Sequence, residues 1–196
     1  MRKTVLAALL AMIGTALWAA DASAEPLGSK AAKKLLFPAK GAEVEVLPVD
    51  FLSASDKQVL ETVGKAQKYY GAIAAAPDEG LLSEATMAAA DFHDVGAAKV
   101  AALAGCNEKR KGGGKCVVVA LIRPRGWKEG RALQLNRDAT AGFRKFRRGR
   151  APRALAISRT TGEWSFAKGA GAREEAVKTC NETTKGANDC QVVVAD

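Results

Sequence analysis

The chain has 196 residues, which is long enough to bury a core either as one domain or as two small halves. Its formal net charge is +9, and only 6% of its residues are aromatic while 19 are glycines, so the core should be packed mainly from small side chains. After residue 24 no apolar run approaches the length of about 20 residues that a membrane-spanning helix needs. We therefore expect no transmembrane segment in the mature chain.

Residues 1–24 have the three parts of a secretory signal peptide. A basic start (MRK) precedes an apolar stretch (VLAALLAMIGTALW), and Ala-Ser-Ala ends the segment with the small-x-small pattern of a cleavage site. The alternative, an N-terminal anchor helix, needs a longer apolar run. No Cys follows the apolar stretch, so a lipoprotein attachment point is missing. We therefore expect a protein that begins near Glu25 and is periplasmic or secreted in a Gram-negative bacterium.

The next residues suggest a strand, a helix and a hairpin. Residues 25–42 are expected to form an N-terminal extension, followed by a first strand in AEVEVLPV. The stretch SDKQVLETVGKAQK is typical of a helix, with Ser55 as its N-cap. YYGAIAAA then predicts a strand, and a turn at Gly80 leads to a second strand in LLSEATMAAADF.

An alanine-rich helix and a valine-rich strand follow the hairpin. Ala98, Ala102 and Cys106 are spaced at i, i+4 and i+8, which places them on one stripe of a helix. Such a stripe of small residues lets the helix lie close to a sheet and directs the Cys inward. The strand in CVVVALI has no alternation of polar residues, so we expect both of its faces to be covered.

The chain then repeats the same order of features. The tripeptide Cys-Asn-Glu occurs at Cys106 and again at Cys180, each time with a second Cys ten positions later and a valine run after it. An offset of 82 positions aligns Gly80 with Gly162, and the offset of the Cys pairs is 74, so the first copy carries eight extra residues. We infer two tandem repeats at residues 43–123 and 138–196, joined by a basic linker at 124–137.

The second repeat predicts the same elements from different residues. RDATAGFRKFRR is typical of a helix, RALAIS and EWSFAKGA of a hairpin, and CQVVVAD of the last strand. Ala172, Ala176 and Cys180 form the second stripe. The predicted fold is α+β, in which each repeat is a small antiparallel or mixed sheet, a hairpin plus a valine-rich strand, packed by Ala-rich helices.

All four cysteines lie in the mature chain, and an even number in an oxidising compartment indicates disulfides. Local pairing, Cys106 with Cys116 and Cys180 with Cys190, closes two short loops and is favoured because short loops close easily. Pairing of equivalent positions, Cys106 with Cys180 and Cys116 with Cys190, also respects the repeat. No metal site is predicted, because the spacing is not Cys-x-x-Cys and the only His is His93.

The motifs of the second repeat resemble a known family, the exported bacterial domain of unknown function 4189, which is often found in tandem. The residues that carry the resemblance are Ala154–Ile157, Gly162, Trp164, Ala172–Cys180, Cys190, Val192 and Val193. The first repeat departs from the pattern, because it has the eight extra residues and no tryptophan after Gly80. The resemblance implies no established activity. Some similar tandem chains carry the name 5-aminolevulinic acid synthase, but pyridoxal-phosphate chemistry needs a Schiff-base lysine in a far larger domain.

Two motifs could carry chemistry. DFHD holds Asp91, His93 and Asp94, and a His between carboxylates could act as a general base or a metal ligand. The alternative is a polar strand end, whose alternating side chains point to opposite faces. KGGGK at 111–115 could cradle a phosphate, but it precedes a strand rather than a helix, so a flexible tip of the Cys loop is favoured.

The strongest signal beyond folding is charge. Residues 123–153 contain eleven Lys and Arg against Glu129 and Asp138, a balance of +9, whereas the chain without residues 1–24 totals +8 after loss of Arg2, Lys3 and Asp21. The equivalent helix of the first repeat is nearly neutral. We predict an anion-binding patch made of Arg144, Lys145, Arg147, Arg148, Arg150 and Arg153.

The partners that fit such a patch in an exported protein are anionic lipid head groups, lipopolysaccharide or an acidic protein. Nucleic acid is a poor candidate because of export. The leading hypothesis is a non-enzymatic binding or structural module without a cofactor or catalytic residue. The alternative is an enzyme or enzyme accessory with a site between the two repeats near Asp91 and His93.

Overall fold

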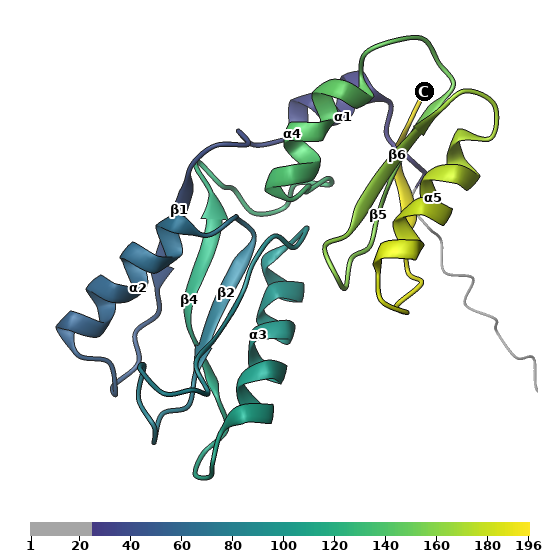
Figure 1. The fold of residues 1–196 in the computed structure, drawn as a ribbon. Coiled ribbons are helices and arrows are strands. Elements are labelled where there is room, and N and C mark those ends of the chain that lie inside the picture. Colours follow the sequence, from purple (N-terminus) through teal and green to yellow (C-terminus); the bar gives the residue numbers. More distant parts are fainter. Residues whose placement is uncertain (1–24) are drawn as a thin grey trace, which may run out of the picture.

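The computed structural model describes residues 25–196, so the predicted signal peptide lies outside the described residues. Five helices and seven strands follow one another in this part of the chain (Figure 1). They are α1 (Ser29–Leu35), β1 (Ala42–Val46), α2 (Ala54–Ala66), β2 (Gly71–Ala75), β3 (Met87–Ala89), α3 (Val95–Lys109), β4 (Val117–Pro124), α4 (Arg137–Phe146), β5 (Arg153–Ile157), β6 (Trp164–Lys168), α5 (Ala172–Thr183) and β7 (Gln191–Ala195). Across residues 25–196 we find no helix that is both long and apolar enough to cross a bilayer.

The strands form two antiparallel sheets, which confirms the predicted α+β class. The first half of the molecule (residues 42–124) has the strand order β1-β4-β2-β3, and the second half (residues 137–196) has the order β6-β5-β7. In the first half, α2 covers one face of the sheet and α3 the other (Figure 1). In the second half, α5 covers one face, while α4 and α1 pack on the opposite one. Each sheet is therefore enclosed by helices on both faces.

Equivalent strands of the two halves share the same irregularity. The register of β2 against β4 shifts between Ile73 and Ala74, and the register of β5 against β7 shifts between Leu155 and Ala156. These positions are the ones that the offset of 82 brings together. The two halves also have the same order of helix, strand, strand, helix and strand. The layout agrees with the predicted tandem repeats.

The cysteines pair locally, as the favoured prediction stated. Cys106 is bonded to Cys116 and Cys180 to Cys190, with Cα–Cα distances of 6.1 and 6.0 Å. The Asn that follows the first Cys of each pair has a defined role. The side-chain oxygen of Asn107 accepts a 3.1 Å hydrogen bond from the backbone N–H of Cys116. Its counterpart in the second half makes a 3.0 Å bond to the N–H of Cys190. In each half, the disulfide and the Asn hydrogen bond thus close the loop before the last strand, which explains why the Cys-Asn pair is repeated.

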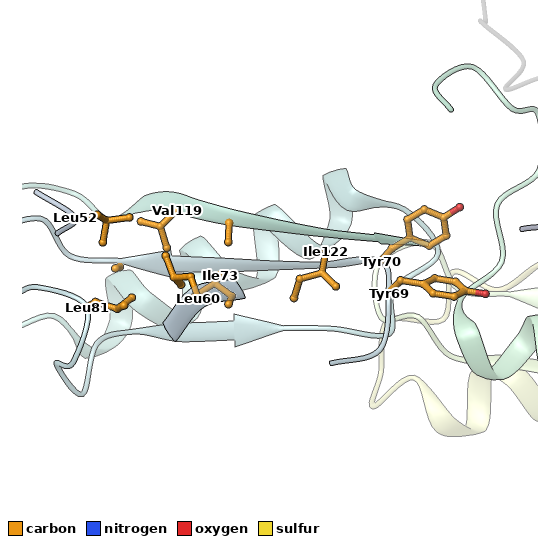
Figure 2. Packing of buried hydrophobic residues seen from close by; sticks show 10 residues of the cluster. Leu52, Leu60, Tyr69, Tyr70, Ile73, Leu81, Val119 and Ile122 are labelled. Atoms are coloured by element: carbon orange, nitrogen blue, oxygen red, sulfur yellow. The ribbon is translucent and has the colours of Figure 1, made fainter. Parts of the chain in front are cut away.

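The alanine stripes pack as predicted. Ala98, Ala102 and Cys106 of α3 are fully buried against the first sheet, and the equivalent residues of α5 are buried against the second. On the other face of the first sheet, Leu60 of α2 packs with Val119 and Ile122 of β4 (Figure 2). The valine-rich strand β4 is therefore covered on both faces.

Local details differ from the sequence-based expectations at two places. The N-cap of α2 is Ser53 rather than Ser55, because Ser53 and Asp56 form a reciprocal capping box. The second strand of the first hairpin is only Met87–Ala89, because residues 77–85 form successive turns stabilised by bonds such as Thr86 Oγ1 to the carbonyl of Leu81.

The N-terminal extension packs on the second half, although it is adjacent in sequence to the first. Leu27 forms a parallel bridge with Val194 of β7, and Ala32 of α1 is fully buried in the second core. The N–H of Ser29 donates to the carboxylate of Asp196 at 2.8 Å. The described part of the chain therefore starts on the second half, crosses to form the first half and returns, which ties the two halves together.

Candidate functional site

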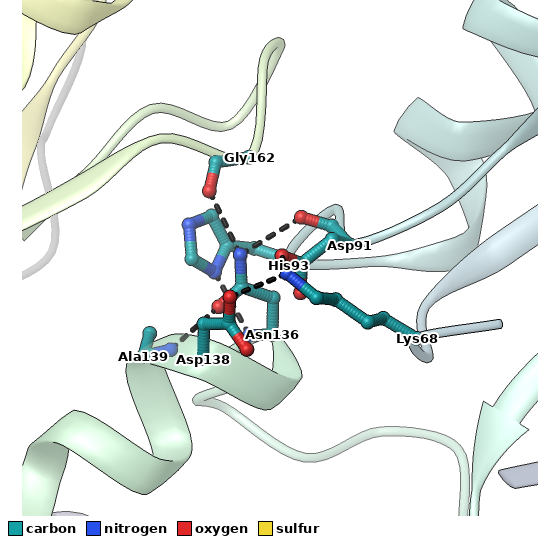
Figure 3. A network of polar contacts seen from close by, with 7 residues as sticks. All are labelled: Lys68, Asp91, His93, Asn136, Asp138, Ala139 and Gly162. Carbon is teal, nitrogen blue, oxygen red and sulfur yellow. Dashed lines mark hydrogen bonds and ion pairs between the residues drawn. The ribbon is translucent and has the colours of Figure 1, made fainter.

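The two halves meet at a buried polar junction centred on His93 and Asn136 (Figure 3). His93 lies in the loop between β3 and α3, and Asn136 immediately precedes α4. Both are 1% exposed. The backbone N–H of Asn136 donates to Nδ1 of His93 at 3.0 Å, and Nε2 of His93 lies 3.2 Å from the carbonyl of Glu163. Because Nδ1 accepts, Nε2 must carry the proton and donate, so the imidazole is neutral and held on both sides.

Burial lowers the pKa of His93 to about 4, since a charged ring would lose its hydration. Neither nitrogen of this neutral ring has a free lone pair for a substrate proton. The DFHD segment is also no strand end. Asp91 has a left-handed backbone (φ 68°), which turns the chain inward, and Asp94 caps α3 by accepting from the N–H of Ala97 at 2.8 Å. The segment therefore has a structural role at the junction between the two halves.

Asn136 forms hydrogen bonds to four groups: its backbone N–H bonds to His93, and its side chain bonds to three further groups. Its side-chain oxygen caps α4 by accepting from the N–H of Ala139 at 2.7 Å. Its side-chain nitrogen donates to the carbonyls of Asp91 and Gly162, each at 2.8 Å. The close approach at Gly162 needs a glycine, because a Cβ there would lie 2.4 Å from the carbonyl oxygen of Asp91. The side-chain amide of Asn136 thus joins the start of α4 to both halves of the molecule.

An ion-pair triad lies beside the junction. Nζ of Lys68 lies 2.9 Å from a carboxylate oxygen of Asp91 and 2.5 Å from one of Asp138, so it bridges the two halves (Figure 3). The hydrogen bonds to Asp138 and Asp91 raise the pKa of Lys68. Burial raises the pKa of Asp91, and the hydrogen bond from Lys68 opposes that rise. All three side chains are partly exposed, so the triad contributes little to stability and mainly orients the two halves relative to each other.

The structure splits the predicted anion-binding residues into two groups. Five of them are exposed at the C-terminal end of α4 and in the turn after it: Arg144, Lys145, Arg147, Arg148 and Arg150. Arg153 is different, since its side chain is 13% exposed and pairs with Asp196 at 2.8 Å. It also donates to the carbonyls of Arg147 and Gly149 at the end of α4, at 2.7 and 2.9 Å. Arg153 is therefore occupied within the fold.

A groove runs between α4 and the segment after α1, with a cavity volume of about 520 Å³. Its floor is apolar and includes Leu36, Phe37 and Phe143. The cations that line it are Lys33, Lys40, Arg144 and Arg147, and none of them belongs to an ion pair within residues 25–196. No carboxylate is among the lining residues. Sequence reasoning missed Lys33 and Lys40, because they lie on the N-terminal extension, about 100 positions before α4.

The glycine-rich tip of the first Cys loop is held by the turn at Asp78 and Glu79. The N–H of Gly114 donates to Asp78 at 2.6 Å, and that of Lys111 to Glu79 at 2.7 Å. Two carboxylates thus already occupy two of the amides that a phosphate would need. Between Glu25 and Asp196 no cluster of three or more His, Cys, Asp or Glu has the arrangement of a metal site.

No family model, curated protein or solved structure matches this chain. The resemblance to the exported tandem family therefore stays a prediction that rests on the motifs quoted above.

Proposed function

We propose that this protein is an exported binding module that docks on anionic phospholipid surfaces through the groove between α1 and α4. The observation that carries the proposal is the composition of the groove, in which Lys33, Lys40, Arg144 and Arg147 surround an apolar floor without any carboxylate. Phospholipid head groups present the matching chemistry, a phosphate above the first apolar groups of the lipid. The two disulfides fit an oxidising compartment, where such surfaces are accessible.

The charge of the groove sets the expected strength. Each Lys or Arg close to an anionic bilayer contributes about 1 kcal/mol, so four cations give an affinity that is useful only when many lipids are present. Binding should weaken steeply with salt, since the Debye length falls from about 10 Å at 0.1 M to about 3 Å at 1 M. The exposed cations Lys145, Arg148 and Arg150 lie nearby in the chain and add to the attraction.

The experiment is co-sedimentation with vesicles that contain phosphatidylglycerol, with pure phosphatidylcholine vesicles as the reference. Wild type should sediment with the anionic vesicles at low salt. It should stay in solution at about 1 M salt, because the salt ions then screen the attraction between the exposed cations and the lipid phosphates. The double variants Arg144→Gln/Arg147→Gln and Lys33→Gln/Lys40→Gln should each lose most of the binding. The matched control is Lys57→Gln/Lys65→Gln, which removes the same charge from exposed positions on α2.

Three outcomes would contradict the proposal. If wild type ignores anionic vesicles at low salt, the groove is an ordinary solvated surface. If the α2 control loses as much binding as the groove variants, the effect comes from net charge alone. If the protein is retained on lipopolysaccharide or on an acidic protein but not on phosphatidylglycerol, the phospholipid assignment is wrong.

A further inference from the structure

A second cationic cavity lies between the halves, away from the α1–α4 groove. It has a volume of about 380 Å³, which falls in the range of small-molecule sites. Its walls come from the first turns of α3, the end of β4, the segment from Trp127 to Gln134, and Arg159 in the turn between β5 and β6. His93 borders it, with both ring nitrogens already engaged. Arg159 is the lining residue that the second half contributes.

Four cations from four different segments converge on this cavity: Lys99, Arg123, Arg131 and Arg159. The carboxylates among the lining residues are Asp94 and Glu129, and Asp94 is occupied in capping α3. The lining holds four cations against two carboxylates, a formal excess of +2, and like charges that lie close together repel one another. The lining therefore favours a ligand with negative charge.

The four cations have different roles. Arg123 pairs with Glu45 and stacks on Trp127 with its guanidinium carbon 4.3 Å from the ring centroid, while its buried Nε has no hydrogen-bond partner. Arg131 donates to the carbonyl of Leu35 and lies 3.9 Å from the centroid of Phe37. These contacts fix the two guanidinium groups in place.

Lys99 and Arg159 make no ion pair within the described chain, so their charges remain available. A site that combines fixed guanidinium planes with free cations is suited to an anion with several oxygens, because guanidinium binds carboxylate and phosphate oxygens in pairs. An anion with one charge would compensate only half of the formal excess of +2 that the four cations and two carboxylates of the lining leave.

We infer that the cavity between the halves binds a small multivalent oxyanion, either a polycarboxylate or a phosphate compound. This site shares no lining residue with the phospholipid-docking groove, although Arg131 of the cavity lies against Phe37 of the groove. The bound anion would join cations from both halves, so occupancy should also stabilise the junction. Since the walls belong to both halves, a change in how they pack would change the affinity.

The fluorescence of Trp127 can report on binding, because Trp127 lines the cavity, whereas Trp164 packs against Gly142 of α4. The disulfide-bonded protein is titrated with citrate, with inorganic phosphate and with sodium chloride at matched ionic strength, and tryptophan fluorescence and thermal melting are followed. We expect a saturable change in fluorescence and a rise in melting temperature with citrate or phosphate but not with chloride. A response to one of the two anions identifies the ligand as a carboxylate or a phosphate.

The variant that tests the assignment is Lys99→Gln/Arg159→Gln, which should weaken binding at least tenfold without lowering the melting temperature of the free protein. Its control is Lys109→Gln/Lys178→Gln, which removes the same charge from exposed positions on α3 and α5. A response to citrate and phosphate no larger than that to chloride overturns the inference, and so does an equal loss of binding in the two variants. Neither result affects the vesicle experiment, because Lys33, Lys40, Arg144 and Arg147 are unchanged.

Discussion

The backbone N–H of Asn136 donates a 3.0 Å hydrogen bond to Nδ1 of His93, across 43 residues of sequence and across the junction between the halves. The same Asn136 side chain caps α4 and holds the carbonyls of Asp91 and Gly162. The only histidine of the chain is therefore a structural element whose protonation state is coupled to the packing of the two halves.

The first prediction concerns acid. The folded pKa of His93, about 4, lies below the unfolded value of 6.5, so the folded state resists protonation. Stability from this group is complete above about pH 6.5 and is lost as pH falls toward about 4, by about 3 kcal/mol in total. Protonation also places a second ring N–H against the N–H of Asn136. Asp91, whose pKa is raised by burial, opposes part of this loss. Urea unfolding at a series of pH values measures the effect.

The control for acid sensitivity is His93→Gln, which removes the titrating group. This variant should be less stable than wild type at pH 7, because it disturbs buried hydrogen bonds, but its stability should depend less on pH between 4 and 6.5. An equally steep pH dependence in the variant would show that other groups cause the acid sensitivity.

The second prediction concerns Asn136. Asn136→Ala should destabilise the protein by about 2–4 kcal/mol, because it removes a helix cap and leaves buried carbonyls without donors. Asn136→Asp keeps a cap acceptor but sets a carboxylate against two carbonyl oxygens, so it should cost nearly as much. Ser53→Ala, which removes only a cap on α2, should cost about 1 kcal/mol. If Asn136→Ala costs no more than Ser53→Ala and Asn136→Asp costs little, the cap alone accounts for the role of Asn136.

The third prediction compares two equivalent glycines. Gly162 and Gly80 both have left-handed backbones, with φ of 81° and 76°. A Cβ at Gly162 would lie 2.4 Å from the carbonyl oxygen of Asp91, whereas nothing lies within 4 Å at Gly80. Gly80→Ala should cost about 1–2 kcal/mol for the backbone conformation alone. Gly162→Ala should cost clearly more, because the halves must move apart. Thermal melting of the two variants decides between the outcomes.

The fourth prediction concerns the helix stripes. Ala102→Leu and Ala176→Leu should each destabilise the fold by about 1–3 kcal/mol, because a larger side chain must lift the helix from its sheet. Ala104→Leu provides a matched control on α3, since Ala104 is exposed. Its effect should stay within about 0.5 kcal/mol. A large loss in the control would mean that the helix tolerates leucine poorly at any position.

The sequence alone determined the local features of this protein. The spacing of Ala98, Ala102 and Cys106 specifies a face of a helix, since side chains at i and i+4 share one side. The separation of ten between Cys106 and Cys116 made a local disulfide the easier one, because a short loop loses little entropy on closing. The positive charge of α4 could also be read directly from the sequence. Each of these features depends on neighbours within a few turns of chain.

Only the tertiary structure decided what these features contact. Nothing in the periodicity of the chain places α1 on the second half, and so Lys33 and Lys40 joined Arg144 and Arg147 in one groove only through folding. The sequence likewise suggested a strand at DFHD, whereas docking of the halves draws His93 into a buried junction with Asn136. Periodicity records which face of an element is buried, but the partner across a sheet or between two halves is set by packing of distant segments.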